Sequence, residues 1–176
     1  AWRPRAWQPG DDLPINPKRT NGYIAVSSFR RAADSSWRRR TDLFGHGLAV
    51  MVDDVGTKVP ESVIVLRPSA ILETSPGNYQ YWYFIEPTDD KLMFDAVIKA
   101  FIEQKLLGND PGMNGVNRVG RVPGYINGKA AYKGFRVTAT ELRDYRYPLD
   151  EIRDAFGLTL SPKRRRRTHA PIDSRY

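Results

Sequence analysis

Short apolar runs alternate along the chain with polar stretches that contain proline and glycine, a pattern that predicts several strands. Residues 23–29 combine β-branched and aromatic residues and predict one strand. Residues 48–52 are apolar throughout and predict a buried strand. Two more strands are expected at 70–74 and 79–85, and the proline–glycine turn between them makes 70–86 a β-hairpin.

The helical pattern is clearest over residues 88–107. Thr88 suits the N-cap, the two aspartates after it favour the positive end of the helix dipole, and Gly108 ends the helix. One stripe of this helix is apolar and broad enough to lie on a sheet. The stripe consists of Leu92, Met93, Ala96, Val97, Ala100 and Phe101.

Weaker signals mark the remaining segments. Residues 118–125 predict a strand that a proline–glycine pair breaks, and 135–138 predict a further short strand. Residues 147–156 predict a short helix with a proline in its first turn. Residues 30–42 are charged and rich in arginine, and predict either a short helix or a loop.

Strands and a long helix in mixed order predict an α+β or α/β sandwich, with helices covering one face of a largely antiparallel sheet. The length of 176 residues suits one domain with its own core. Residues 1–20 hold four prolines and little periodicity, so we expect an extended N-terminal arm. Residues 161–176 predict a basic disordered tail. The domain itself is expected at 21–160.

Composition adds a preference for polyanionic partners. The formal net charge is +8, and five of these charges lie in the run 163–167. This balance favours nucleic acid, although a tail that serves only solubility or targeting is the alternative.

The absence of cysteine excludes disulfides and thiolate metal sites, and fits a reducing cytoplasm. No window approaches the ~20 apolar residues that span a bilayer, and the polar N-terminus predicts no signal peptide, so we expect no membrane partner.

Asp53 and Asp54 directly follow the most apolar predicted strand. Burying adjacent carboxylates is costly unless a cation offsets their charge, and such oxygen ligands suit Mg²⁺ or Mn²⁺. Neighbouring side chains on a regular strand point to opposite faces, so the strand must bulge or end here if both are to serve one site. Gly56 makes a turn easy. A solvated turn is the alternative, and the dipeptide alone favours it.

The turn after 70–74 offers polar groups for phosphate oxygens. A hairpin turn is a sufficient explanation of this segment. Its backbone amides, together with the side chains of Ser75, Asn78 and Gln80, also suit phosphate binding. Gln80 would lie beside Asp53 if the hairpin pairs with the strand that carries the aspartates.

A second polar segment supplies fixed positive charge. Arg118, Arg121 and Lys129 suit a triphosphate or a template backbone, and a charged edge strand is the alternative. Asp110 lies just before this segment in a loop rich in glycine and asparagine, where it is either a third carboxylate of the site or an ordinary turn residue. The chain has two histidines, His46 and one in the tail, which leaves almost no candidate residues for a hydrolytic triad or a multi-histidine zinc site.

Four ordered segments together resemble the RepB-type DNA primase domain, a mobile-element branch of the archaeo-eukaryotic primase superfamily. They are 23–30 (YIAVSSFR), 52–58 (VDDVGTK), 68–80 (PSAILETSPGNYQ) and 117–129 (NRVGRVPGYINGK). The resemblance spans roughly residues 20–160. It implies the α+β class, with an RRM-like primase core whose carboxylates bind metal.

The resemblance also implies roles for single residues. Asp53 and Asp54 correspond to the paired metal ligands and Asp110 to the third carboxylate. Arg121, Asn127 and Lys129 match the family's segment near the incoming nucleotide or the template. The acidic pair is adjacent here, whereas the superfamily usually separates the two acids by one residue. Gln80 stands where the superfamily often has histidine.

The function that follows is that of a DNA primase or primase-polymerase-like nucleotidyltransferase, an enzyme that synthesises a short primer by two-metal catalysis with Mg²⁺ or Mn²⁺. The implied partners are single-stranded DNA template, nucleoside triphosphates and a replicative helicase or other replication proteins, during plasmid or phage replication in the cytoplasm of a bacterial host. One alternative is a catalytically inactive nucleic-acid-binding domain of the same fold that assists replication. A structural or interaction protein of a phage or plasmid is another.

Overall fold

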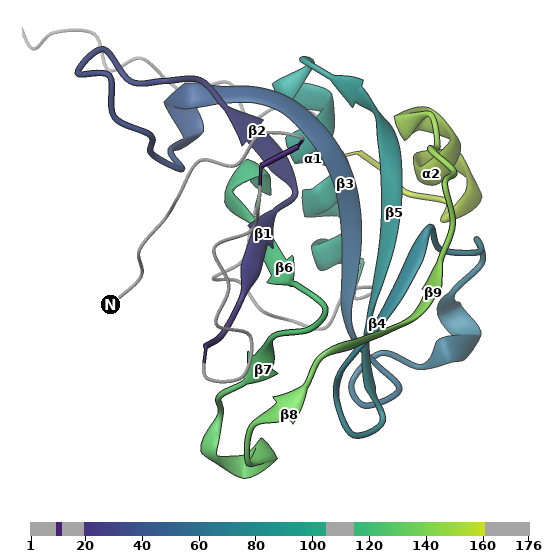
Figure 1. The fold of residues 1–176 in the computed structure, drawn as a ribbon. Coiled ribbons are helices and arrows are strands. Elements are labelled where there is room, and N and C mark those ends of the chain that lie inside the picture. Colours follow the sequence, from purple (N-terminus) through teal and green to yellow (C-terminus); the bar gives the residue numbers. More distant parts are fainter. Residues whose placement is uncertain (1–9, 12–19, 105–114, 161–176) are drawn as a thin grey trace, which may run out of the picture.

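The computed structural model describes residues 10–11, 20–104 and 115–160 (Figure 1). Its strands are β1 (Tyr23–Ala25), β2 (Ser27–Phe29), β3 (Phe44–Val55), β4 (Ala70–Ser75), β5 (Asn78–Thr88), β6 (Val119–Arg121), β7 (Ile126–Asn127), β8 (Phe135–Arg136) and β9 (Thr138–Leu142). Its α-helices are α1 (Lys91–Glu103) and α2 (Leu149–Ala155). Short 3₁₀ turns lie at η1 (Thr41–Leu43), η2 (Glu61–Val63), η4 (Gly115–Asn117) and η5 (Ala130–Tyr132).

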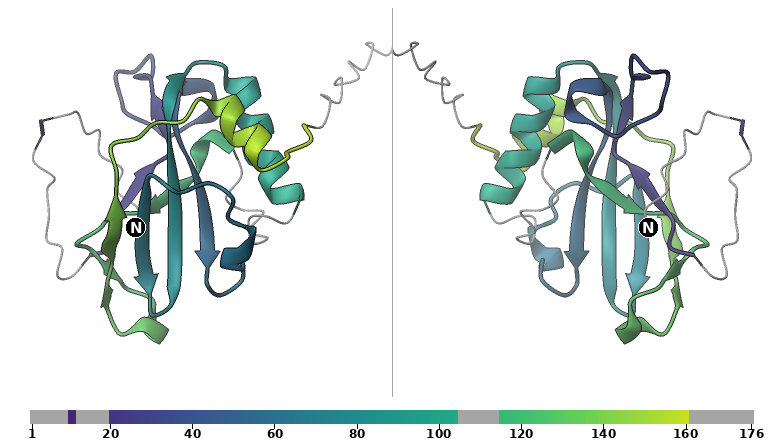
Figure 2. Two further views of the ribbon diagram at one scale, coloured as in Figure 1. Left: turned by 90° about the vertical axis from the view of Figure 1, so that its right-hand side faces the viewer. Right: turned by 90° about the vertical axis from the view of Figure 1, so that its left-hand side faces the viewer.

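The main sheet has the strand order β2-β3-β5-β4-β9, and neighbouring strands are antiparallel. Two small sheets, β1-β6 and β7-β8, lie beside it. Both α-helices lie on the same side of the main sheet (Figure 2). The α+β prediction, with helices on one face of a mostly antiparallel sheet, is therefore confirmed, and so is the hairpin of β4 and β5.

The period of two along β5 divides its side chains between the two faces of the sheet. Tyr83 is fully buried on the helix face, and its ring packs edge-on against Phe156, with centroids 5.6 Å apart. Phe156 in turn contacts Phe101 of α1 at 4.9 Å. The next residue in the strand, Trp82, faces the other way and is also buried. Both faces of β5 are thus covered.

Strand β6 covers the face opposite the helices. A Cβ atom at Gly120 would lie 2.0 Å from the Trp82 ring and 2.6 Å from the Met51 sulfur. Because only glycine leaves room for these contacts, β6 approaches the sheet closely here. This approach carries the flanking residues Arg118 and Arg121 against the face of the sheet, where both are buried.

The strand predicted at 23–29 is two strands, β1 and β2, that pair with different partners. β1 pairs with β6, whereas β2 pairs with β3. Val26 joins them: its amide donates to the Arg118 carbonyl, and its carbonyl accepts from the Leu48 and Ala49 amides. An apolar run predicts extended backbone but does not say which neighbour each half will find.

The long helix starts later than predicted. Thr88 is the last residue of β5, and Asp90 is the N-cap of α1, since its carboxylate accepts from the amides of Leu92 and Met93. The buried face holds Phe94, Val97, Ile98, Ala100 and Phe101. Leu92 belongs to the predicted stripe but is 55% exposed, because the spacing i, i+3, i+4, i+7 is centred on Phe94.

The remaining predictions have mixed outcomes. Residues 30–40 form a loop rather than a helix, and residues 118–125 begin with the three-residue strand β6. Residues 135–138 contribute to two strands, β8 and β9, and α2 lies within the predicted 147–156. Most of the predicted arm, the whole predicted tail and the end of the long helix lie outside the described residues. Within the part of the chain that is described, no helix is long and apolar enough to cross a membrane.

Candidate active site

Strand β3 changes register at the adjacent aspartates. Val52 pairs with Tyr81 and Val55 with Tyr79, so three steps along β3 oppose two steps along β5. The extra residue is a β-bulge over Asp53 and Asp54. Asp54 has a φ of +58°, in the left-handed region that aspartate tolerates better than most side chains. The bulge brings both carboxylates to one site, which a regular strand does not allow.

A tight turn fixes the backbone after the bulge. The Asp54 carbonyl accepts from the amides of Thr57, Lys58 and Val59 at 2.9–3.2 Å. Gly56 has a φ of +87°, and a Cβ atom there would lie 2.7 Å from the Gly77 carbonyl of the neighbouring hairpin. The turn after β3 therefore packs directly against the β4–β5 turn, and only glycine fits at the contact.

The two turns and the segment after β6 enclose a cavity of about 450 Å³. Most of the residues predicted from the sequence lie together in its wall. The lining residues are Asp53, Asp54, Thr57, Lys58, Thr74, Ser75, Pro76, Asn78, Gln80, Arg121, Asn127, Lys129 and Tyr132. Of the other predicted site residues, Arg118 is buried close enough to act on Asp53. Asp110 lies outside the described residues.

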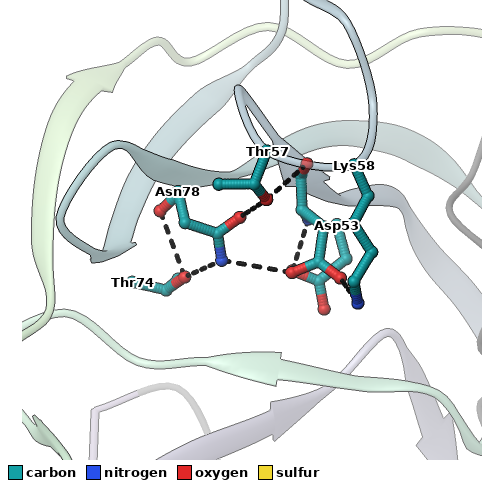
Figure 3. Close-up of polar contacts among 6 residues, drawn as sticks. Asp53, Thr57, Lys58, Thr74 and Asn78 are labelled. Carbon is teal, nitrogen blue, oxygen red and sulfur yellow. Dashed lines mark hydrogen bonds and ion pairs between the residues drawn. The ribbon is translucent and has the colours of Figure 1, made fainter. Parts of the chain in front are cut away.

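Asn78, which is labelled in Figure 3, holds the Asp54 carboxylate in place. Its side-chain amide donates to Asp54 Oδ1 at 3.1 Å, and its side-chain oxygen accepts from the Thr57 hydroxyl at 2.6 Å. The Thr74 hydroxyl donates to the Asn78 carbonyl at 3.2 Å. On the outer side, Lys58 Nζ lies 2.5 Å from Asp54 Oδ2. Asp54 is therefore oriented by hydrogen bonds from both adjoining turns.

The surroundings of Asp53 disfavour the ionised form of its carboxyl group. Burial raises the pKa of its carboxyl first, and the neighbouring charge of Asp54 raises it further. The charge of Arg118, the Asp54 amide at 2.9 Å and a hydrogen bond with Gln80 lower this pKa, but they do not offset the rise. A cation bound between Asp53 and Asp54 would offset the remaining repulsion.

Arg121 is the buried positive group of the cavity. It is 7% exposed, and its guanidinium donates to Asn127 Oδ1 at 2.8 Å and to Asn21 Oδ1 at 3.1 Å. It also lies over the Tyr23 ring, 5.0 Å from the centroid. All of these partners are neutral. A buried guanidinium among neutral partners attracts an anion, and its planar donors suit phosphate.

Several predicted nucleotide-binding residues make hydrogen bonds within the protein. Asn127 accepts from Arg121 and donates to the Thr74 carbonyl at 2.8 Å. Gln80 accepts from the Arg121 amide at 2.9 Å while it also bonds Asp53. The Gly77 amide of the hairpin turn donates to Glu73 at 3.0 Å. These residues position the charged groups. Three cations line the described part of the cavity, of which Lys58 pairs with Asp54, and Arg121 and Lys129 are the two that the sequence predicted.

The donor set fits a divalent cation. Mg²⁺ commonly takes one or two carboxylates together with water and substrate phosphates, and Mn²⁺ favours similar oxygen ligands. Asp53 and Asp54 supply the two carboxylates. In the described ranges, no group of three or more histidine, cysteine, aspartate or glutamate side chains converges to hold a metal ion. A second ion would need further oxygen ligands, either from a phosphate or from Asp110.

Several groups of the site were not predicted from the sequence. Lys58 and Thr57 stand in the VDDVGTK segment, four and three residues after Asp54, where a tight turn would have predicted contact. Asn21 and Thr74 had no local signal. They belong to the site only because residues distant in sequence pair with them, as Asn21 does with Arg121 and Gly128.

Comparisons with known proteins bear on the fold and the family. The AEP domain of the primase-polymerase of cyanophage S-2L has a similar structure, with a TM-score of 0.58, 16% identity, and coverage of 77% of this chain and 70% of that one. This likeness shows that the fold is that of an AEP domain. A comparison with curated proteins gives no match.

Two further solved structures are less similar. They are primase RepB′, with a TM-score of 0.47 and 21% identity, and the catalytic domain of primase RepB′ in complex with initiator DNA, with 0.48 and 22%. The match covers 65% of this chain in both cases, but 40% of the first and 60% of the second, so this chain spans less than two thirds of either.

The model of the RepB DNA-primase N-terminal domain matches residues 11–151, which is most of the chain and includes every described residue of the site. Together with the AEP fold, this match confirms the resemblance of the four segments. The chain belongs to the RepB DNA-primase N-terminal domain family.

Proposed function

We propose that this domain synthesises a short primer on single-stranded DNA by nucleotidyl transfer in the cavity at the end of β3. One observation carries the proposal. The same cavity contains a carboxyl pair, whose mutual repulsion a cation would offset, and a buried arginine, whose charge an anion would offset. A nucleoside triphosphate with its divalent ion supplies both charges at once.

In this proposal the acidic residues of the cavity bind metal and the basic residues bind phosphate. Asp53 and Asp54 would hold Mg²⁺ or Mn²⁺, and we propose Asp110 as the third carboxylate of a two-metal site. When bound, such ions lower the pKa of an attacking 3′-hydroxyl and offset the charge of the pyrophosphate leaving group. Arg121 and Lys129 would bind the phosphates and stabilise the negative charge that grows on them.

Gln80 has a positioning role in this proposal. It bonds both Asp53 and the backbone of Arg121, and so fixes the distance between the metal-binding side and the phosphate-binding side of the cavity. No histidine is needed as a general base, since a bound metal can activate the hydroxyl. Membership of a primase family supports template-directed synthesis over other nucleotidyl transfers. The setting we propose is plasmid or phage replication in a bacterial cytoplasm.

A primer-synthesis assay tests this function. The chain is incubated with single-stranded DNA, Mn²⁺ and labelled ribo- or deoxyribonucleoside triphosphates. We expect product from the wild type and at least a ~100-fold loss in Asp53→Asn and Asp54→Asn, since each removes a carboxylate that would hold the metal ion acting on the reacting phosphate. Asp154→Asn, an exposed change on α2, is the matched control and should retain activity. DNA binding by the wild type without any product would instead support the inactive accessory domain.

A further inference from the structure

The loop between β2 and β3, residues 30–42, holds the positive charge of the folded domain. It has five arginines and two aspartates, a net charge of +3. The run 163–167 contributes five of the eight net charges, so the chain outside these two segments is formally neutral. The loop projects beyond the ends of the two strands it joins (Figure 1). Its arginines are all exposed.

Hydrogen bonds within the loop hold it in one shape. The Asp34 carboxylate accepts from the Ser36 amide at 3.1 Å and binds Arg38 Nη2 at 2.5 Å. The Ala32 amide donates to the Ser36 carbonyl at 3.0 Å, and Ser35 has a φ of +61°. A loop ordered in this way loses less conformational entropy when a ligand binds.

An exposed aromatic side chain stands among these charges. The Trp37 side chain is 40% exposed, although a tryptophan of a folded domain is usually well covered. The Arg31 guanidinium lies over its ring, 5.3 Å from the centroid. An indole and a guanidinium plane next to each other form a surface on which unpaired bases stack, while neighbouring arginines bind the phosphates.

The loop is attached to the segment that lines the candidate active site. Arg39 donates to the Asn117 carbonyl at 2.7 Å, and the Asn117 side chain donates to the Thr41 hydroxyl at 2.8 Å. The backbone carbonyl of the next residue, Arg118, accepts from the Val26 amide, and the Val26 carbonyl accepts from the Ala49 amide of β3. β3 begins at Phe44, just after the loop, and Phe44 precedes Asp53 by nine residues, roughly 30 Å along a strand. A single strand of DNA that follows β3 from the cavity would therefore reach the loop after about nine nucleotide steps of ~3.4 Å.

We propose that residues 30–42 bind the single-stranded template, with Trp37 stacking on an unpaired base and Arg30 and Arg31 contacting phosphates. The proposal rests on the proposed function, since it gives the template a path from the cavity to the loop. Single-stranded DNA is favoured over duplex because the bases of a duplex are already stacked on one another and cannot stack on the indole.

Fluorescence anisotropy with a labelled oligothymidylate of about 20 nucleotides tests the proposal, because this length exceeds the 4–16 nucleotides of a typical single-strand site. Metal and triphosphate are left out. Trp37→Ala should weaken binding roughly tenfold, whereas Trp37→Phe keeps a stacking ring and should retain most of it. Arg30→Ala/Arg31→Ala should lower the slope of log K against log salt by about 1.4. Lys99→Ala, an exposed change on α1, is the control.

The outcomes separate this inference from the proposed function. Equal affinity of Trp37→Ala and wild type for the oligothymidylate would overturn the inference, even if the chain makes primers. An equal loss of affinity of Trp37→Ala for duplex DNA of the same length would also overturn it. If Trp37→Ala binds oligothymidylate more weakly but the wild type makes no primer, the loop still binds single-stranded DNA. The proposed primer synthesis is then wrong.

Discussion

Asp53 and Asp54 show how one extra residue in a strand changes the chemistry available to it. Without the bulge, one carboxylate would point towards the helices and the other towards β6. With it, both line one cavity, and Asp53 has a raised pKa because burial and its neighbour disfavour its charge. The raised pKa means that the ionised pair destabilises the folded protein until a cation binds.

Replacing Asp53 with asparagine should therefore stabilise the protein while it removes metal binding. The change removes the repulsion but keeps an oxygen for the Asp54 amide. We expect the free energy of unfolding to rise by about 0.5–2 kcal/mol, the usual gain from relieving a functional site. Thermal melts with and without Mn²⁺ measure both effects. Mn²⁺ should raise the melting temperature of the wild type but not of Asp53→Asn. A lower melting temperature for the variant without metal would contradict this prediction.

Asn127 should contribute to stability as well as to the site. Its side chain bonds Arg121 and the Thr74 carbonyl, and it is 2% exposed. Asn127→Ala leaves both partners buried without this hydrogen bond, which costs roughly 1–3 kcal/mol. Urea denaturation measures the loss. Thr140→Ala, which removes an exposed hydroxyl, should change the free energy of unfolding by less than about 0.5 kcal/mol. Similar losses in the two variants would argue against the role of Asn127.

At the scale of elements, the contact of β6 with the main sheet decides where the cationic residues lie. Gly120 allows this contact because the Trp82 ring and the Met51 sulfur occupy the space that any side chain would need. The glycine therefore links a packing requirement to the position of Arg121, its neighbour in the chain. A change at Gly120 should disturb the site without touching any charged residue.

Gly120→Ala should cost about 1–3 kcal/mol, because overpacking forces side chains and backbone to shift. Triphosphate binding should weaken in the same variant, since β6 carries Arg121. Adding Trp82→Phe makes room and should restore part of both losses. Thermal melts and a binding titration of the single and double variants measure the effect. Additive losses in the double variant would show that the ring does not limit the approach of β6.

At the scale of the whole molecule, the sequence predicted elements better than it predicted their partners. The β4–β5 hairpin was predictable because its turn and its strands are local. The division at Val26 was not, since one apolar run gives no sign that its halves pair with β6 and β3. The start of α1 was predicted too early because Thr88 suits an N-cap as well as Asp90 does, and only the length of β5 decides between them.

The site was predicted in outline for a similar reason. The carboxylates, the turn and the basic segment each had a local pattern, and the structure brings them to one cavity. The pattern did not distinguish residues that face the cavity from those that hold others in place. Asn127 and Gln80 look like ligands in sequence, whereas their hydrogen bonds lie within the protein. Their catalytic or binding roles stay predictions.

Calorimetric titration of a nucleoside triphosphate into the chain with Mn²⁺ shows whether the cavity binds a metal ion and a triphosphate together. We expect saturable binding to the wild type, at least tenfold weaker binding to both Asp53→Asn and Lys129→Ala, and unchanged binding to the control Asp154→Asn. Equal affinity of Asp53→Asn and the wild type would show that the triphosphate binds without the carboxylates at the end of β3, and would rule out a shared metal–triphosphate site.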